Sequence, residues 1–183
     1  MKLKKIGKFS IIFINFFMWG ILSSTAQVYS DKELLTPQLL AHYDVDELEA
    51  VEKAIQEDPN NADAYLKRGI IRSHSQEDFT GAIEDFTKAI RLQPEAETYN
   101  YRGTAYFWLQ KYQKAIEDYE QAIALDPVLA IAYYNRAYAQ LELGNTSKAI
   151  EDFRKGATLS EQQGDSISHQ QALQLIEDLE EEN

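Results

Sequence analysis

The chain contains no cysteine and comparatively few basic residues. The lack of cysteine excludes disulfides, thiolate metal sites, iron–sulfur clusters and thiol nucleophiles. Eighteen lysines and arginines against thirty aspartates and glutamates give a net charge of -12 over 183 residues. Such a chain offers no basic face, so we expect neither nucleic acid nor an anionic lipid surface as a partner.

Residues that could build a catalytic or metal site are also scarce. The three histidines (His42, His74, His169) have no partner one helical turn away, so no metal site and no cofactor is predicted. Adjacent carboxylates such as Glu117 and Asp118 point in different directions around a helix and cannot act on one substrate. We therefore predict that the protein is not an enzyme. An activity lost on mutating either carboxylate, without unfolding, would reverse that prediction.

The first thirty residues are organised like a secretory signal peptide. Four lysines precede an apolar run over 9–22, and small residues follow at 23–26. The run is shorter than the ~20 residues that span a bilayer comfortably, which favours a cleaved signal. We expect cleavage after Ala26 and a secreted or periplasmic protein without a stable membrane span. An uncleaved anchor is the alternative.

The middle of the chain repeats with a period of 34 residues. The phrase Ala-Ile-Glu-Asp-aromatic occurs at 82–86, 115–119 and 149–153. A tyrosine and an arginine three residues later recur in each unit, as Tyr65, Tyr99 and Tyr133 with Arg68, Arg102 and Arg136. Within each unit apolar residues return every three or four positions, as on one face of a helix. Each unit is therefore predicted to be two antiparallel helical arms, ended by proline in the first two units.

This pattern resembles the tetratricopeptide repeat (TPR), here of an exported bacterial type. The resemblance implies an all-α fold, a right-handed α-solenoid of helical hairpins closed by a C-terminal capping helix. The expected organisation is a signal peptide (1–26), N-terminal helices forming a degenerate partial repeat (27–61), three repeats over 62–163 (62–95, 96–129 and 130–163), and a capping helix (164–183). Within the partial repeat, 33–43 and 44–59 are expected to form two separate arms.

Two sets of repeated residues are expected to hold the hairpins together. Small residues in the first arms let the two arms approach closely; these are Gly69, Gly103 and Ala137. The repeated arginines Arg68, Arg102 and Arg136 have two interpretations. They form either a ladder of anion-binding groups or ion pairs with the Glu-Asp motif of the second arm. Their register with the packing residues favours the structural interpretation.

The resemblance also implies that the first arms line a concave groove for a partner segment. The residues at the expected groove positions are mostly apolar or aromatic. They are Leu66, Ile70, Asn100, Thr104, Phe107, Trp108, Tyr134, Tyr138 and Leu141. Exposed aromatic side chains are common anchors of protein interfaces, so Trp108, Tyr134 and Tyr138 are the expected anchors. The alternative is that Phe107, Trp108 and Leu141 pack against the flanking helices.

The predicted function is non-catalytic binding of a protein or peptide segment, as an adaptor or assembly factor. The acidic surface favours a basic partner. A structural scaffold is the alternative, with its groove filled by its own flanking helix and its ends forming a homo-oligomer. The repeat subtype that clamps chaperone tails is not expected. At the positions where the resemblance implies polar clamp residues, only Asn135 is polar; the others are Leu66, Ile70, Tyr101 and Ile131.

Overall fold

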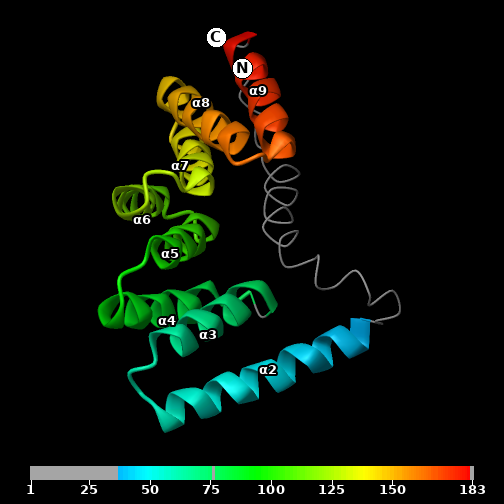
Figure 1. Ribbon diagram of the computed structural model, residues 1–183, viewed down its shortest axis with the longest axis vertical. Coiled ribbons are helices and arrows are strands. Elements are labelled where there is room, and N and C mark those ends of the chain that lie inside the picture. Colours follow the sequence, from blue (N-terminus) through cyan, green and yellow to red (C-terminus); the bar gives the residue numbers. More distant parts are fainter. Residues whose placement is uncertain (1–36, 76, 182–183) are drawn as a thin grey trace. The chain divides into compact units, whose positions relative to one another are not determined.

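The computed structural model describes residues 37–75 and 77–181, and this part of the chain contains eight helices and no strand (Figure 1). The helices are α2 (Pro37–Glu57), α3 (Ala62–Ser75), α4 (Phe79–Leu92), α5 (Ala96–Trp108), α6 (Tyr112–Leu125), α7 (Ala130–Glu142), α8 (Thr146–Gln162) and α9 (Ser166–Glu181). The expected all-α class is confirmed. The expected signal peptide lies outside the described residues. No described helix combines the length and the apolar character needed to cross a bilayer.

The chain divides into two units, 1–43 and 44–183, and the second unit contains the stack of hairpins. From α3 to α9, every helix packs on the next one in sequence. The first arms α3, α5 and α7 also contact one another in order. At the N-terminal end of this unit, Val51 of α2 packs against Ala64 and Ile71 of α3. The hydrophobic core is therefore a continuous row of small clusters between successive arms, as expected for a repeat protein.

Proline ends two of the second arms. Gln93 and Asp126 precede Pro94 and Pro127 and have extended backbones, with φ of -148° and -133°. The proline ring disfavours helical conformation at the residue before it, so α4 and α6 stop there after 14 residues each. No proline stands at this point in α8, which continues for 17 residues to Gln162.

Helix α2 is continuous where two arms were expected. The described part of the partial repeat is one helix of 21 residues, Pro37–Glu57, without a break at residue 43. No glycine or further proline lies within it, so nothing in the local sequence ends the helix there. Pro37 is the first residue of the helix, where a backbone N–H would have no helical hydrogen-bond partner in any case. The expectation of two separate arms is wrong for these residues.

Left-handed residues reverse the chain between antiparallel helices. Gly144 and Gly164 have φ of 76° and 78° in the turns after α7 and α8, and Gln110 has φ of 58° after α5. Glycine adopts this conformation without steric cost, which makes the turns short and tight. Consequently the C-terminal ends of α5 and α7 and the N-terminal ends of α6 and α8 lie at one edge of the stack, called here the turn edge.

Candidate functional site

Each repeated arginine forms a two-pronged ion pair with the aspartate of the Glu-Asp motif on the second arm. The pairs are Arg68–Asp85, Arg102–Asp118 and Arg136–Asp152, with N···O distances of 2.6–2.9 Å. Each guanidinium also lies 5.5–5.7 Å from the ring centroid of the tyrosine three residues earlier. We call these groups the Tyr–Arg–Asp sets. Two parallel hydrogen bonds to a carboxylate fix both distance and orientation, so each set fixes one arm against the other.

The aspartates of these sets are buried, with 3–7% of their surface exposed. Both oxygens of each carboxylate accept hydrogen bonds from the guanidinium. The hydrogen bond to Asp118 is the main cause that raises the pKa of Arg102 above its already high ordinary value. Asp85 accepts a further ion pair from Arg72, at 2.9 Å. Because the arginines are engaged in this way, the sets have the geometry of structural ion pairs and not of an anion-binding ladder.

Glycine makes room for an aromatic ring inside the hairpins. A Cβ atom added at Gly69 would lie 2.6 Å from the Phe86 ring, and one added at Gly103 would lie 2.7 Å from the Tyr119 ring. Both rings are fully buried. The arms of these two hairpins can therefore be this close only because the first arm lacks a side chain at that point. Ala137, at the matching position of the third hairpin, is also completely buried.

None of the nine expected groove residues is fully exposed. Six are half-buried, namely Leu66, Ile70, Thr104, Phe107, Trp108 and Leu141. Three are buried, namely Asn100, Tyr134 and Tyr138. The amide of Asn135 donates to the Asn100 side chain at 2.9 Å, which ties α7 to α5. The hydroxyl of Thr104 donates a hydrogen bond to the Asn100 carbonyl and accepts one from the Tyr119 hydroxyl. Burial raises the pKa of Tyr119 well above its ordinary value.

The expectation of exposed anchors at Tyr134 and Tyr138 is wrong, because both side chains are buried. The Tyr134 ring covers Gly156 of α8, where an added Cβ would lie 2.5 Å away, and its hydroxyl donates to Ser160 at 3.0 Å. Tyr138 packs edge-on against Phe153 of the same helix, with centroids 5.1 Å apart. Both tyrosines therefore belong to the core of the third hairpin. The sequence signal for Tyr134 is the glycine at 156, where the first two hairpins have alanine.

Phe107 and Trp108 pack against aromatic residues of the neighbouring repeat helices α4 and α6. Trp108 stacks on Phe79 at the start of α4, with centroids 6.0 Å apart. Phe107 meets Tyr112 at the start of α6, with centroids 5.3 Å apart. Neither Phe79 nor Tyr112 is among the expected groove residues. Their signal is an aromatic residue as the first residue of a second arm, in two consecutive units.

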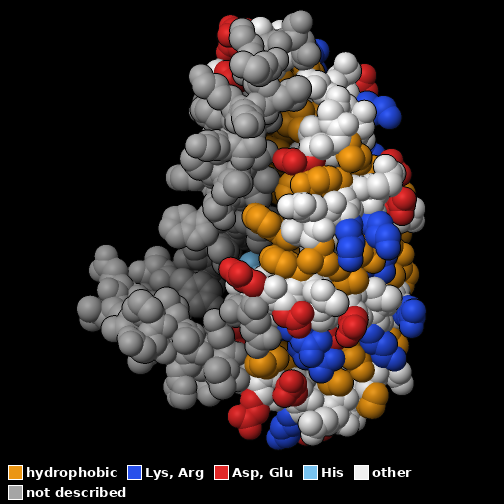
Figure 2. All heavy atoms as spheres, turned by 180° about the vertical axis from the view of Figure 1, so that it is seen from behind, with side chains coloured by type: hydrophobic (Ala, Val, Ile, Leu, Met, Phe, Trp, Pro, Cys, Tyr) orange, Lys and Arg blue, Asp and Glu red, His pale blue; other side chains and the backbone are white. Residues whose placement is uncertain are grey.

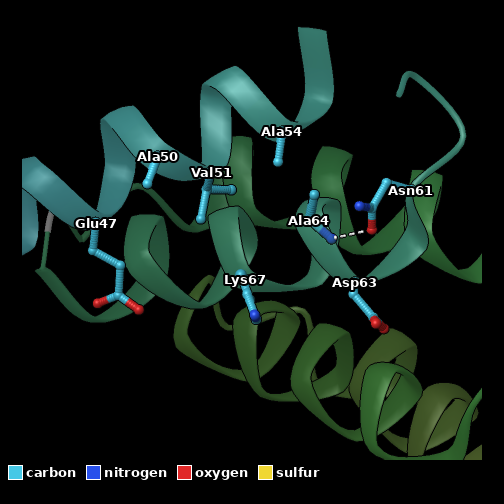
Figure 3. A pocket seen from close by; sticks show the side chains of 8 residues that line it. All are labelled: Glu47, Ala50, Val51, Ala54, Asn61, Asp63, Ala64 and Lys67. Atoms are coloured by element: carbon cyan, nitrogen blue, oxygen red, sulfur yellow. Dashed lines mark hydrogen bonds between the residues drawn. The ribbon is translucent and has the colours of Figure 1, made fainter. Parts of the chain in front are cut away.

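A shallow hollow of about 360 Å³ lies between α2 and α3 (Figure 3). Its lining consists of small or apolar side chains with charged or amide groups from both helices; the residues are Glu47, Ala50, Val51, Ala54, Asn61, Asp63, Ala64 and Lys67. Asn61 uses its side-chain oxygen to accept from the Ala64 N–H at 3.0 Å, capping α3. Among the described residues no group of three or more histidines and carboxylates is placed to bind a metal ion.

Family models identify the repeats. Three models described as "Tetratricopeptide repeat" match residues 62–95, 96–127 and 118–151. Residues 62–151 therefore belong to the tetratricopeptide-repeat family. The third match begins within α6, includes α7 and ends near the start of α8, so it overlaps the second match.

Curated relatives match part of this chain. Tetratricopeptide repeat protein 13 of Homo sapiens is 39% identical over 74 residues, which is 40% of this chain and 9% of the relative. Small glutamine-rich tetratricopeptide repeat-containing protein 2 of Saccharomyces cerevisiae is 32% identical over 114 residues, which is 60% of this chain and 33% of the relative. The chain thus spans at most a third of the length of these two relatives.

Solved structures have the same fold. The crystal structure of MamA matches with a TM-score of 0.59 and 26% identity, over 81% of this chain and 97% of that chain. The TPR2B domain of yeast Sti1, in a complex with pHsp70, matches with a TM-score of 0.63 and 24% identity, over 67% and 98%. At 24% identity the similarity to Sti1 establishes the solenoid fold of this chain and says nothing about what this chain binds.

The Tyr–Arg–Asp sets predict a large effect of a small substitution. Asp118→Asn keeps the side-chain shape but leaves Arg102 without its charge partner in a half-buried site. We expect the free energy of unfolding to fall by about 2–3 kcal/mol, measured by urea titration.

The matched control is Glu180→Gln, which removes the charge of an exposed ion pair with Arg154. Its cost should stay below about 0.5 kcal/mol. Equal effects of the two substitutions would contradict a stabilising role of the Asp118 pair.

Proposed function

We propose that the protein is a non-catalytic adaptor that binds a segment of another protein along the first arms α3, α5 and α7. The observation that carries this proposal is the set of half-buried side chains on three consecutive, mutually contacting first arms. Leu66, Thr104 and Leu141 give one such residue in each arm. Half-buried apolar groups still lose water when a partner covers them, so they contribute binding energy.

The second arms supply a rigid support for these residues. Their inward faces carry the aspartates of the Tyr–Arg–Asp sets and the rings that cover Gly69 and Gly103. Among the described residues no buried side-chain nitrogen or oxygen lacks a hydrogen-bond partner. A scaffold without internal defects loses little conformational entropy on binding, which favours recognition of a flexible segment.

The chemistry of the partner differs from that of chaperone tails. The first TPR of RPAP3 is similar to this chain at 24% identity, and its structure holds the HSP90 peptide SRMEEVD. Residues 44–183 of this chain carry 28 acidic and 13 basic side chains, so an acidic tail of that kind would be repelled. Leu66, Ile70 and Ile131 are apolar at positions where such a clamp needs polar groups. A partner segment that is apolar and basic fits this surface better.

End-to-end self-association is the less favoured function. Residues 44–63, at the start of the stack, contain eight acids and one lysine, and residues 156–183, at its end, contain seven acids and neither lysine nor arginine. Two ends of the same charge repel one another, most strongly at low ionic strength. Figure 2 shows hydrophobic side chains on one face interspersed with charged ones. The negative charge shared by the two ends supports the adaptor over the self-associating scaffold.

We further propose that the protein is exported, in a bacterial cell, to a secreted or periplasmic location. The basic start, the short apolar run and the small residues before Gln27 support this proposal. If the signal is removed, the chain recovered outside the cytoplasm begins at Gln27, as determined by N-terminal sequencing or intact mass. A recovered chain that still begins at Met1 and stays with the membrane fraction would establish the uncleaved anchor instead.

Partner capture tests the adaptor function. The full chain is used as bait in a cell-envelope extract, beside a Leu66→Ala/Leu141→Ala variant that truncates two first-arm residues. We expect at least one protein to be retained by the native bait and reduced about tenfold or more by the variant, since each truncation removes roughly 1 kcal/mol of apolar contact. Quantitative mass spectrometry measures the ratio.

The control is Leu125→Ala/Val128→Ala, which truncates two residues exposed by 51% and 57% outside the first arms. This variant should retain the partner at the native level, with circular dichroism showing that all baits are folded. If the first-arm variant retains the same proteins as the control, the first arms are not the binding surface.

A further inference from the structure

Four aromatic rings from three consecutive helices meet beside the turns of the first two hairpins. Phe79 begins α4, Phe107 and Trp108 end α5, and Tyr112 begins α6. Phe79 and Trp108 are stacked, with ring planes 14° apart. Phe107 meets Trp108 edge-on at 6.2 Å and Tyr112 at 5.3 Å. We call these four residues the aromatic cluster.

The cluster is not a closed core. All four residues are half-buried, whereas the rings inside the hairpins, Phe86 and Tyr119, have at most 1% of their surface exposed. Core aromatic residues are covered on both faces by the opposite arm. The cluster lies at helix ends, and its four rings are only partly covered there. Part of its aromatic surface therefore remains accessible to a partner.

Several tyrosine rings elsewhere in the stack hold cations. Lys88 lies over Tyr65 and Lys114 over Tyr106, each 5.6 Å from the centroid, in addition to the three arginines of the Tyr–Arg–Asp sets. Within the described part of the chain, no lysine or arginine lies over a ring of the aromatic cluster. These rings offer the same chemistry without an internal cation.

Carboxylates beside the cluster favour a cation, and Lys111, which directly precedes Tyr112, is the basic residue next to it in the sequence. Asp78 directly precedes Phe79 and caps α4, and Glu77 beside it is exposed. Burial, the charge of Glu142 and a hydrogen bond to Glu142 raise the pKa of the Tyr112 hydroxyl, so this carboxylate lies beside the hydroxyl. The electron-rich faces of aromatic rings attract cations, and a neighbouring carboxylate adds to that attraction.

We propose that the aromatic cluster binds arginine side chains of the partner segment. This inference rests on the proposed adaptor function and specifies the chemistry of its partner. Arginine suits the site better than lysine, because its planar guanidinium stacks on aromatic rings and loses its hydration more readily. The first arms would hold the apolar residues of the segment while the cluster holds an arginine at the turn edge.

A fluorescence titration tests the inference directly. Trp108 is one of two tryptophans, so the full chain with Trp19→Phe has Trp108 as its single indole reporter. The probe is the extended peptide acetyl-Gly-Arg-Gly-Arg-Gly-Arg amide. Its matched control replaces each arginine by citrulline, which has nearly the same shape and no charge.

We expect the arginine peptide to change the Trp108 emission saturably, with a Kd at least about fivefold lower than that of the citrulline peptide. The ratio should shrink as salt is raised to about 0.5 M, because screening weakens charge attraction at exposed sites. Phe79→Leu, which removes the ring stacked on Trp108, should raise the Kd for arginine about threefold or more. Tyr101→Leu removes a ring stacked on Phe86 outside the cluster and should leave that Kd unchanged.

Equal affinities for the two peptides, or no saturable response to the arginine peptide, would overturn the inference. The peptide comparison needs no ring substitution, so it decides the matter even if Phe79→Leu does not fold. Leu66 and Leu141, on which partner capture depends, lie outside the cluster. If a partner is captured through the first arms but the arginine and citrulline peptides bind equally, the adaptor function stands and this inference is wrong.

Discussion

The whole stack depends on the close approach of two helical arms at a residue without a side chain. Gly69 faces the buried ring of Phe86, and Gly103 faces that of Tyr119. A Cβ atom at either glycine would lie too close to the ring to be accommodated. The ring fills the space between the arms, and the next hairpin packs on the surface so formed. In the third hairpin the same contact is reversed, with the glycine on the second arm and Tyr134 on the first.

The Tyr–Arg–Asp sets give this packing its register. Hydrophobic contact alone is non-directional, whereas two hydrogen bonds between a planar guanidinium and a carboxylate fix the sliding and rotation of one arm against the other. The sets use the polar groups of the inner faces, whereas the half-buried residues of the first arms and the aromatic cluster keep part of their surface exposed beside their packing contacts. This division between support and surface is what connects the fold to a binding function.

Much of this arrangement could be predicted from the sequence, because the period of 34 residues repeats the packing residues in register. The pairing of Arg102 with a Glu-Asp motif needs only the knowledge that the two arms are antiparallel. The burial of Tyr134 could not be predicted from its repeat position, since it depends on Gly156 one arm away. Likewise, Trp108 stacks on Phe79 of the preceding hairpin, and such contacts between repeats are not encoded in the pattern of one unit. The continuity of helix α2 was not predicted, because the degenerate repeat was expected to have two arms like the three regular repeats.

The most direct test of this account is the stability of Gly103→Ala, measured by equilibrium urea unfolding. On an open helix, alanine in place of glycine stabilises by about 1 kcal/mol. Here the added Cβ would lie 2.7 Å from the Tyr119 ring, so we expect the free energy of unfolding to fall by about 1–3 kcal/mol instead. In a Tyr119→Leu background, where the ring is absent, the same substitution should cost far less. A Gly103→Ala protein more stable than the native chain would contradict the dependence of the stack on this contact.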